Sequence, residues 1–140
     1  VEASITSTTK ARCQPMTERV MIDIETLGRE PGCVIVSIGA VRFDYGVKEE
    51  LFLDVSPTSC QREGLDIDAE TLAWWLTQGE EARSQLLGGQ PLADALDELA
   101  SFIPTMSKEV WAKSPAFDLE ILATRPTMPG SRPGRWEKRY

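Results

Sequence analysis

Two carboxylates near the start of the chain have a spacing that suits a metal site. Asp23 and Glu25 stand at positions i and i+2 inside the apolar stretch VMIDIETLG, residues 20–28. On a β-strand, side chains two residues apart project from the same face, so both acids are expected to point to one place. A divalent cation is the usual remedy for two like charges held side by side. A strand end whose acids reach solvent explains this pair, taken alone, equally well.

A third acid favours the cation site. Asp118 lies in a second apolar setting, FDLEIL at residues 117–122. Ser114 and Pro115 are expected to cap and begin a helix with Asp118 in its first turn, where the helix dipole stabilises an ionised carboxylate. Hard cations such as Mg²⁺ and Mn²⁺ prefer carboxylate oxygens to Cys or His. We therefore expect Asp23, Glu25 and Asp118 to converge in space.

Between about residues 18 and 124 the chain contains, in this order, the segments DIETLG, VIVSIGAVRFD, ETLAWWLTQ, EEAR and VWAKSPAFDLEIL. Together these segments resemble the DEDD 3′-to-5′ exonuclease superfamily, which has a ribonuclease H-like fold. The branch that they resemble comprises bacterial and phage exodeoxyribonuclease VIII-like proteins and 3′-to-5′ exoribonucleases. The resemblance implies a nuclease that hydrolyses single-stranded RNA or DNA from the 3′ end.

The resemblance also implies roles for the three acids around two Mg²⁺ or Mn²⁺ ions. Asp23 would bridge both metals, Glu25 would serve the nucleophile side and Asp118 the leaving-group side. The family completes this site with a fourth Asp, preceded by a His or Tyr that activates water. The 140 residues contain no histidine and end at Tyr140, so this last motif is not among them. We expect little or no turnover, and a non-catalytic nucleic-acid-binding remnant is the alternative. An unrelated acidic interaction domain is a third hypothesis.

Residues after the acid pair are candidates for substrate binding. Thr26, Leu27 and Gly28 resemble the segment that seats the terminal nucleotide through backbone amides, with Leu27 against its base. As a tight turn after a strand, the three residues need no function. Trp74 and Trp75 offer aromatic rings for base stacking. Helical spacing places at least one of them in the core, and Trp75 is the one that we assign to substrate. The preference for RNA or DNA is not encoded in a readable pattern.

The elements that must position these residues follow from hydrophobic periodicity and turn signals. We expect a mixed α/β sheet of ribonuclease H-like type, C-terminally incomplete, with flanking helices. An antiparallel meander should have its first strand at the centre, and a later strand should join it in parallel through a helical crossover. Continuous apolar runs predict that the first two strands are covered on both faces. The predicted strands are 19–25, 33–43, 50–55 and 109–112, and the predicted helices are 69–77, 80–87 and 91–103, with a loop over 56–67.

Composition suits one small domain of residues 16–124, between a disordered extension, 1–15, and an irregular basic tail, 125–140. The net charge is −7, but the tail carries five cations against one acid. Such a tail either contacts phosphates or is merely a solvated end. Three widely spaced cysteines without histidine argue against a disulfide framework or a zinc site and favour the cytoplasm. We expect no secretory leader and no membrane span. The oligomeric state is not encoded in this pattern.

Overall fold

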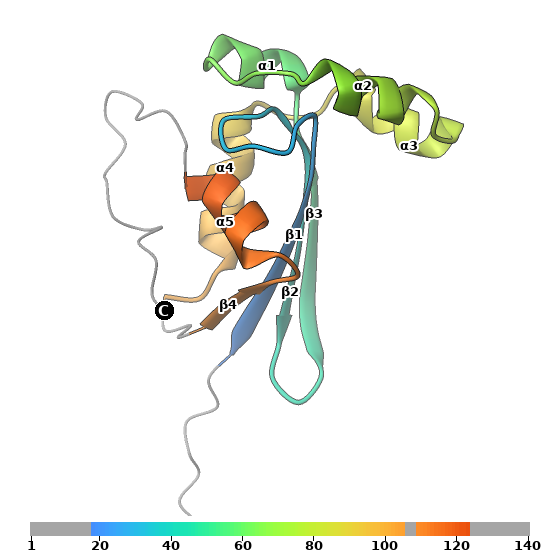
Figure 1. Ribbon diagram of the computed structural model, residues 1–140. Coiled ribbons are helices and arrows are strands. Elements are labelled where there is room, and N and C mark those ends of the chain that lie inside the picture. The colour runs from blue at the N-terminus through green and yellow to red at the C-terminus, as the bar shows by residue number, and fades with distance from the viewer. Residues whose placement is uncertain (1–17, 106–108, 124–140) are drawn as a thin grey trace, which may run out of the picture.

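The centre of the molecule is a four-stranded mixed sheet with the order β3-β2-β1-β4 (Figure 1). The computed structural model describes residues 18–105 and 109–123. β1 pairs antiparallel with β2, β2 pairs antiparallel with β3, and β4 pairs parallel with β1. The predicted meander, the parallel fourth strand and the α/β class are confirmed, but β2 rather than β1 is the middle strand of the meander, and β1 is an inner strand of the sheet because β4 pairs with its other edge. The strands are β1 (Arg19–Thr26), β2 (Ile35–Phe43), β3 (Val47–Asp54) and β4 (Glu109–Ala112).

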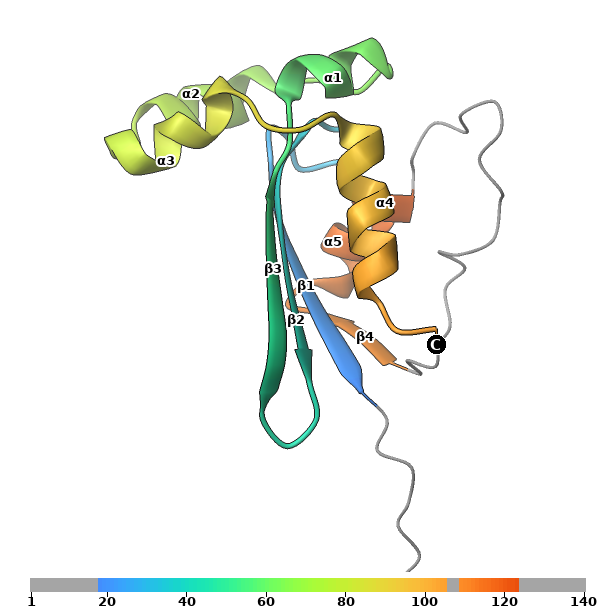
Figure 2. The same cartoon turned by 180° about the vertical axis from the view of Figure 1, so that it is seen from behind.

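The helices form two groups. α4 (Leu92–Phe102) and α5 (Pro115–Ala123) pack on one face of the sheet. α1 (Pro57–Arg62), α2 (Ala69–Leu76) and α3 (Glu80–Ser84) lie at the end of the sheet where β1 ends (Figure 2). In both views α2 and α3 extend past the sheet on the side away from α4 and α5. We call α2, α3 and the following 3-10 turn, Gln85–Leu87, the helical arm.

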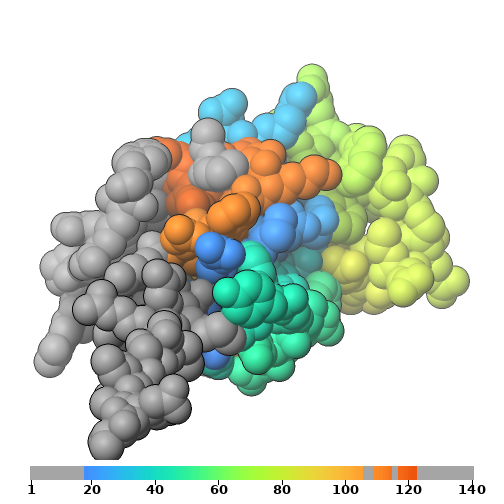
Figure 3. Space-filling view, turned by 90° about the horizontal axis from the view of Figure 1, so that it is seen from below, coloured from blue at the N-terminus to red at the C-terminus, as the bar shows by residue number. Residues whose placement is uncertain are grey.

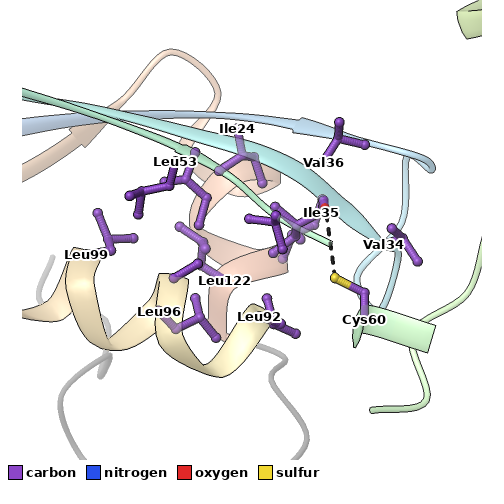
Figure 4. Packing of buried hydrophobic residues seen from close by; sticks show 14 of the residues in the cluster. Ile24, Val34, Ile35, Val36, Leu53, Cys60, Leu92, Leu96, Leu99 and Leu122 are labelled. Carbon is purple, nitrogen blue, oxygen red and sulfur yellow. Dashed lines mark hydrogen bonds between the residues drawn. The ribbon is translucent and has the colours of Figure 1, made fainter. Parts of the chain in front are cut away.

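The hydrophobic core lies between the sheet and α4, with α5 closing one side (Figure 4). Leu92, Leu96 and Leu99 recur at helical spacing on the buried face of α4, as their periodicity predicts. They meet strand residues such as Ile24 and Leu53. Each fully buried Leu or Ile contributes roughly 1.5–3 kcal/mol through the hydrophobic effect. This core fixes the position of β1 against the two helices.

Two local predictions were wrong. The loop expected over 56–67 contains α1, which Ser56 caps by accepting a hydrogen bond from the Ser59 amide at 3.2 Å. β3 begins at Val47 rather than at residue 50, because its charged first half pairs with β2 despite a register shift between Arg42 and Phe43. There Arg42 on β2 forms an ion pair of 2.8 Å with Glu49 on β3. Long-range pairing thus places polar residues in a strand where their own propensity predicts a turn.

The sheet has one face on which α4 and α5 do not pack, and we call it the outer face; among the described elements the helical arm reaches it, where Gln85 accepts a hydrogen bond from Ser37 near the start of β2. Along β1, side chains alternate between buried ones, such as Ile22 and Ile24, and exposed ones, such as Met21 and Asp23. The prediction that the first strand is covered on both faces was therefore wrong. It holds for the first half of β2, where Ile35–Ile38 are all buried. The length and order of the elements around a strand, rather than its own sequence, decide which of its faces is covered.

Other predictions concern the ends of the chain and its cysteines. The predicted extension 1–15 and tail 125–140 lie outside the described residues. Cys33 and Cys60 are free and buried. Within the part that the structure describes, no helix is long and apolar enough to cross a membrane.

Candidate functional site

Asp23 and Glu25 lie side by side on the outer face, near the C-terminal end of β1. Both side chains are exposed, whereas their neighbours Ile22, Ile24 and Thr26 point into the core. The alternation of a β-strand produces this arrangement directly from the i, i+2 spacing. Both acids can therefore reach a ligand that approaches the uncovered face of the sheet.

Asp118 reaches the same strand from α5. It stands in the first turn of the helix, as predicted, and its side chain is buried. Its Oδ2 accepts a hydrogen bond of 3.1 Å from the Ser114 amide, and the backbone amide of Ile24 also stabilises the carboxylate. β4 pairs with β1 only as far as the pair of Ile22 and Ala112, so Ile24 lies past the end of β4. Asp118 thus occupies the edge of β1 that the short strand leaves open.

The three carboxylates act on one another electrostatically. Although the Glu25 side chain is exposed, partial desolvation raises the pKa of Glu25, and the negative charges of Asp23 and Asp118 raise it further. Burial also raises the pKa of Asp118, with a smaller contribution from Asp23, while the amides of Ser114 and Ile24 oppose this shift. Mutual effects of this kind require proximity. The fold therefore brings all three predicted acids to one region at the end of β1.

These residues fit a divalent cation by their chemistry. All three are hard oxygen donors, and a bound cation would relieve the repulsion that, after desolvation, contributes to the raised pKa values of Glu25 and Asp118. In residues 18–105 and 109–123, no three His, Cys, Asp or Glu side chains are already grouped closely enough to hold a metal ion. The acid cluster is thus a region of shared negative potential rather than a closed coordination shell.

The turn after Glu25 is held by packing. The Thr26 hydroxyl donates to the Gly28 carbonyl at 2.7 Å, and the Leu27 amide donates to the Val34 carbonyl at 2.8 Å. A Cβ at Gly28 would lie only 2.5 Å from the Cβ of Cys33, so the turn requires glycine there. The Leu27 side chain is 2% exposed and belongs to the core. As placed, it has no free surface with which to contact a base.

The two adjacent tryptophans have different environments. Trp75 is 4% exposed, and its indole N–H donates to the Thr26 carbonyl at 2.9 Å. Trp74 is 57% exposed and meets Trp75 edge to face, with ring centroids 5.8 Å apart. One of the pair is in the core, as helical spacing predicts, but it is Trp75, the residue that we assigned to base stacking. Its observed contact instead fixes the helical arm to the strand end that carries Glu25.

The sequence did not reveal two polar residues beside Glu25. Ser37 on β2 pairs with Glu25, and its hydroxyl donates to Gln85 of the arm at 3.3 Å. Asp54 on β3 pairs with Ser37 and is exposed. Paired residues share a face of the sheet, so Asp54 adds a further acid to the same row of the outer face. Only the register of the meander, which the sequence did not supply, could have identified it.

The architecture resembles that of solved exonuclease structures. Escherichia coli exonuclease I with a dT13 oligonucleotide superposes with a TM-score of 0.57 at 19% identity, covering 76% of this chain and 23% of that one. A metal-free E. coli exonuclease I complex with single-stranded DNA gives the same TM-score, identity and coverages. Apo exonuclease I also gives a TM-score of 0.57 at 19% identity, with coverages of 78% and 24%. The chain thus spans about a quarter of the length of these enzymes. At this identity the likeness concerns the fold.

Sequence comparison defines the family. No curated protein matches the chain. The model of the 3′-5′ exoribonuclease Rv2179c-like domain matches residues 18–137, which include β1, the helical arm and α5. An acid cluster at the end of β1, a ribonuclease H-like sheet and this match agree with one another. The chain belongs to the 3′-5′ exoribonuclease Rv2179c-like domain family, and its fold is that of a DEDD-type 3′-5′ exonuclease.

Proposed function

We propose that this chain is a metal-binding 3′-5′ exonuclease domain that recognises the 3′ end of single-stranded nucleic acid and turns it over weakly or not at all. The observation that carries the proposal is the placement of Asp23 and Glu25 on the open face of β1 with Asp118 at its edge, where the negative charge of Asp23 contributes to the raised pKa of both other acids. Membership of an exoribonuclease family supports RNA as a substrate. Because exonuclease I has been solved in complex with DNA, single-stranded DNA must be tested as a substrate beside RNA.

The three acids would hold Mg²⁺ or Mn²⁺. Such an ion, when bound, supplies a water of lowered pKa and stabilises charge that develops on the phosphate. Asp23 and Glu25 would reach it from the open sheet face, and Asp118 would reach it from the first turn of α5. The amides of Ser114 and Ile24 hold the Asp118 carboxylate in place, so its orientation does not depend on the ligand.

The neighbouring residues position this cluster. We assign Thr26, Leu27, Gly28 and Trp75 to the framework behind Glu25, because their side chains are buried or their polar groups are engaged within the chain. The single-stranded nucleic acid would approach the acids over the outer face, next to the helical arm. Backbone amides of this turn remain the candidates for contact with the terminal nucleotide.

Weak turnover follows from the residue types. The chain contains no histidine to take a proton from water, and general-base assistance is typically worth a hundred- to ten-thousand-fold in rate. The described residues do not add a fourth acid on a helix beside Asp23 and Glu25. Binding without turnover is therefore the second candidate function. The free cysteines Cys33 and Cys60 agree with a reducing compartment, and we propose the cytoplasm.

A nuclease assay with a binding control tests this function. Purified chain would be incubated with 3′-tailed RNA and DNA in Mn²⁺ or in EDTA, beside Asp23→Asn and the matched surface variant Asp97→Asn on α4. We expect Mn²⁺-dependent binding to a 3′ tail that Asp23→Asn abolishes and Asp97→Asn preserves, with little nucleotide release. An affinity for the 3′ tail that changes neither on removal of Mn²⁺ nor in Asp23→Asn would refute the metal site. Rapid release that is lost in Asp23→Asn would refute weak turnover and show that another group completes the site.

A further inference from the structure

Gly39 leaves a gap without a side chain in the middle of the outer face. It lies on β2, between Asp23 on β1 and Phe52 on β3 in one row of paired residues. Its φ is not positive, and a Cβ at this position would meet only the Asp23 carbonyl, at 3.8 Å. Neither backbone conformation nor packing in the described chain therefore requires glycine, although glycine weakens the interior of a strand. Glycine in a strand interior often marks the close approach of a ligand.

Aromatic and apolar side chains adjoin this gap. Trp111, Met21 and Val41 form one row across β4, β1 and β2. Phe43, two residues farther along β2, meets Trp111 edge to face, with ring centroids 6.4 Å apart. Phe52 and Trp111 are 64% and 51% exposed. Contiguous exposed apolar surfaces of this kind mark interaction sites. We call these five residues, Met21, Val41, Phe43, Phe52 and Trp111, the outer-face patch.

The helical arm borders one end of the patch. Figure 3 shows the molecule from the hairpin end, with the arm in yellow-green extending beyond the strands in blue and teal. The arm reaches the outer face through the hydrogen bond between Gln85 and Ser37, the residue that pairs with Glu25. α4 and α5 pack on the opposite face of the sheet. The patch and the acids thus share one surface, with the acids at the end next to the arm.

The charges on this face are mixed, and its cations are largely engaged. Arg19, at the start of β1, forms an ion pair of 2.9 Å with Glu109 on β4. Lys48, beside the hairpin, pairs with Asp44 at 3.1 Å, and Lys113 is exposed just after β4. The acids that lie in the paired rows near the patch are Asp23, Glu25, Glu50 and Asp54. The described part of the face thus offers much aromatic surface and little free positive charge.

A single-stranded nucleic acid fits such a surface through its bases. Bases are flat and uncharged, and they stack on aromatic side chains of open four-stranded sheets in RNA-recognition motifs. The phosphates can stay in solvent, turned away from the acids. The patch is also continuous with the acid cluster, because Met21 and Asp23 are neighbours on the outer side of β1 and Phe52 shares the row of Asp23. A second copy fits less well, since its outer face would bring the same acids against those of the first.

We propose that the outer-face patch is a base-stacking platform for the nucleotides upstream of the 3′ end of a single-stranded nucleic acid. One base lies on the backbone at Gly39, between Asp23 and Phe52, and bases farther upstream stack on Trp111. The Arg19 guanidinium, 5.9 Å from the centroid of the Trp111 ring, extends this surface. The proposal rests on the proposed nuclease function for the position of the 3′ end. Because stacking rather than charge holds the upstream nucleotides, their contribution to affinity depends only weakly on salt.

Binding of short oligonucleotides to the full chain tests the platform separately from the acid site. Fluorescence anisotropy in Mn²⁺ would compare a 5′-labelled dinucleotide, which occupies the acid cluster alone, with an octanucleotide, in an oligothymidine and an oligouridine series. A stacked base is worth roughly 5- to 150-fold in affinity, so we expect the octanucleotide to bind at least about fivefold more tightly in both series. An octanucleotide with abasic upstream positions keeps its phosphates and should bind no more tightly than the dinucleotide.

Two variants test the residues of the platform. Gly39→Val fills the gap and should remove most of the gain with length, and Trp111→Ala should reduce it. Both should keep the affinity for the dinucleotide. Gly39→Val should also melt at or above the wild-type temperature, because valine favours a strand and its Cβ has room. The control Gly46→Val adds the same side chain in the hairpin, where a Cβ meets no atom within 4 Å, and should leave the gain intact.

Several results would overturn the platform. These are equal affinities for the two lengths, a gain that the abasic probe reproduces, and a gain that survives both Gly39→Val and Trp111→Ala. A wild-type chain that elutes as a dimer, and that becomes monomeric in Trp111→Ala, would identify a second copy as the occupant instead. Failure of the proposed nuclease function is distinguishable, because the affinity for the dinucleotide would then change neither on removal of Mn²⁺ nor in Asp23→Asn.

Discussion

The indole N–H of Trp75 donates to the carbonyl of Thr26, the residue after Glu25, across a distance of 2.9 Å. This bond joins the helical arm to the strand that carries two of the three acids. A buried carbonyl without a partner is costly, so the bond constrains the strand end as well as the helix. The position of Glu25 is therefore coupled to the packing of a helix that begins more than forty residues later in the chain.

Trp75→Phe should loosen this connection. The variant keeps an aromatic ring but leaves the Thr26 carbonyl without its donor, and we expect a loss of about 1–3 kcal/mol in the free energy of unfolding. Trp74→Phe, at the exposed neighbour, should cost less than about 0.5 kcal/mol. Urea denaturation measures both values, and hydrogen exchange should show faster opening of the arm in Trp75→Phe only. Equal costs for the two variants would contradict the assigned role.

Gly28→Ala should disturb the turn behind the acid pair. The new Cβ would lie 2.5 Å from the Cβ of Cys33, so backbone must move, and we expect a destabilisation of about 1–3 kcal/mol. Gly46→Ala, in the β2–β3 hairpin, meets no atom within 4 Å and serves as the control. Thermal melting compares the two. A neutral Gly28→Ala would show that the close approach is not needed.

The pH dependence of stability should report the acid cluster in metal-free protein. Folding raises the pKa of Glu25 and of Asp118, so the folded state holds protons more tightly than the unfolded state. Their stabilising contribution is complete below the ordinary values of 4.5 and 3.8 and is lost as the pH rises through the raised values. Glu25→Gln removes one charge from the cluster. In EDTA at pH 7 it should melt about 1–3 °C above the wild type, a gain that shrinks toward pH 4.

Asp97→Asn, which removes an exposed carboxylate from α4, is the control for that gain. It should change the melting temperature by less than about 1 °C at either pH. A Glu25→Gln variant that melts below the wild type at pH 7 would mean that Glu25 makes a favourable contact that outweighs repulsion by Asp23 and Asp118.

A divalent cation should offset the destabilisation that repulsion among Asp23, Glu25 and Asp118 causes in metal-free protein. Mn²⁺ at about ten times its dissociation constant stabilises a protein that binds it only when folded by about 1.4 kcal/mol, or roughly 5–6 °C here. Asp23→Asn should lose most of this shift, and Asp97→Asn should keep it. Differential scanning fluorimetry across a Mn²⁺ titration gives the result. An unchanged wild-type melting curve at millimolar Mn²⁺ would exclude a metal site at Asp23.

The sequence by itself determined the features that depend on local spacing. The alternation of β1 placed Asp23 and Glu25 on one face, the periodicity of Leu92, Leu96 and Leu99 predicted α4, and Ser114 with Pro115 predicted the start of the helix that carries Asp118. These features follow from backbone geometry within a few residues, which is why they could be predicted without a fold.

Only the tertiary structure decided which surfaces are covered. Trp74 and Trp75 are equivalent in sequence, yet the position of α2 against the end of β1 buries Trp75 and exposes Trp74. Likewise, Met21 lies in an apolar run that predicted burial, but α4 and α5 both pack on the opposite face of the sheet. Burial depends on contacts between elements far apart in the chain. A local pattern records that a side chain is apolar but not which element, if any, lies against it.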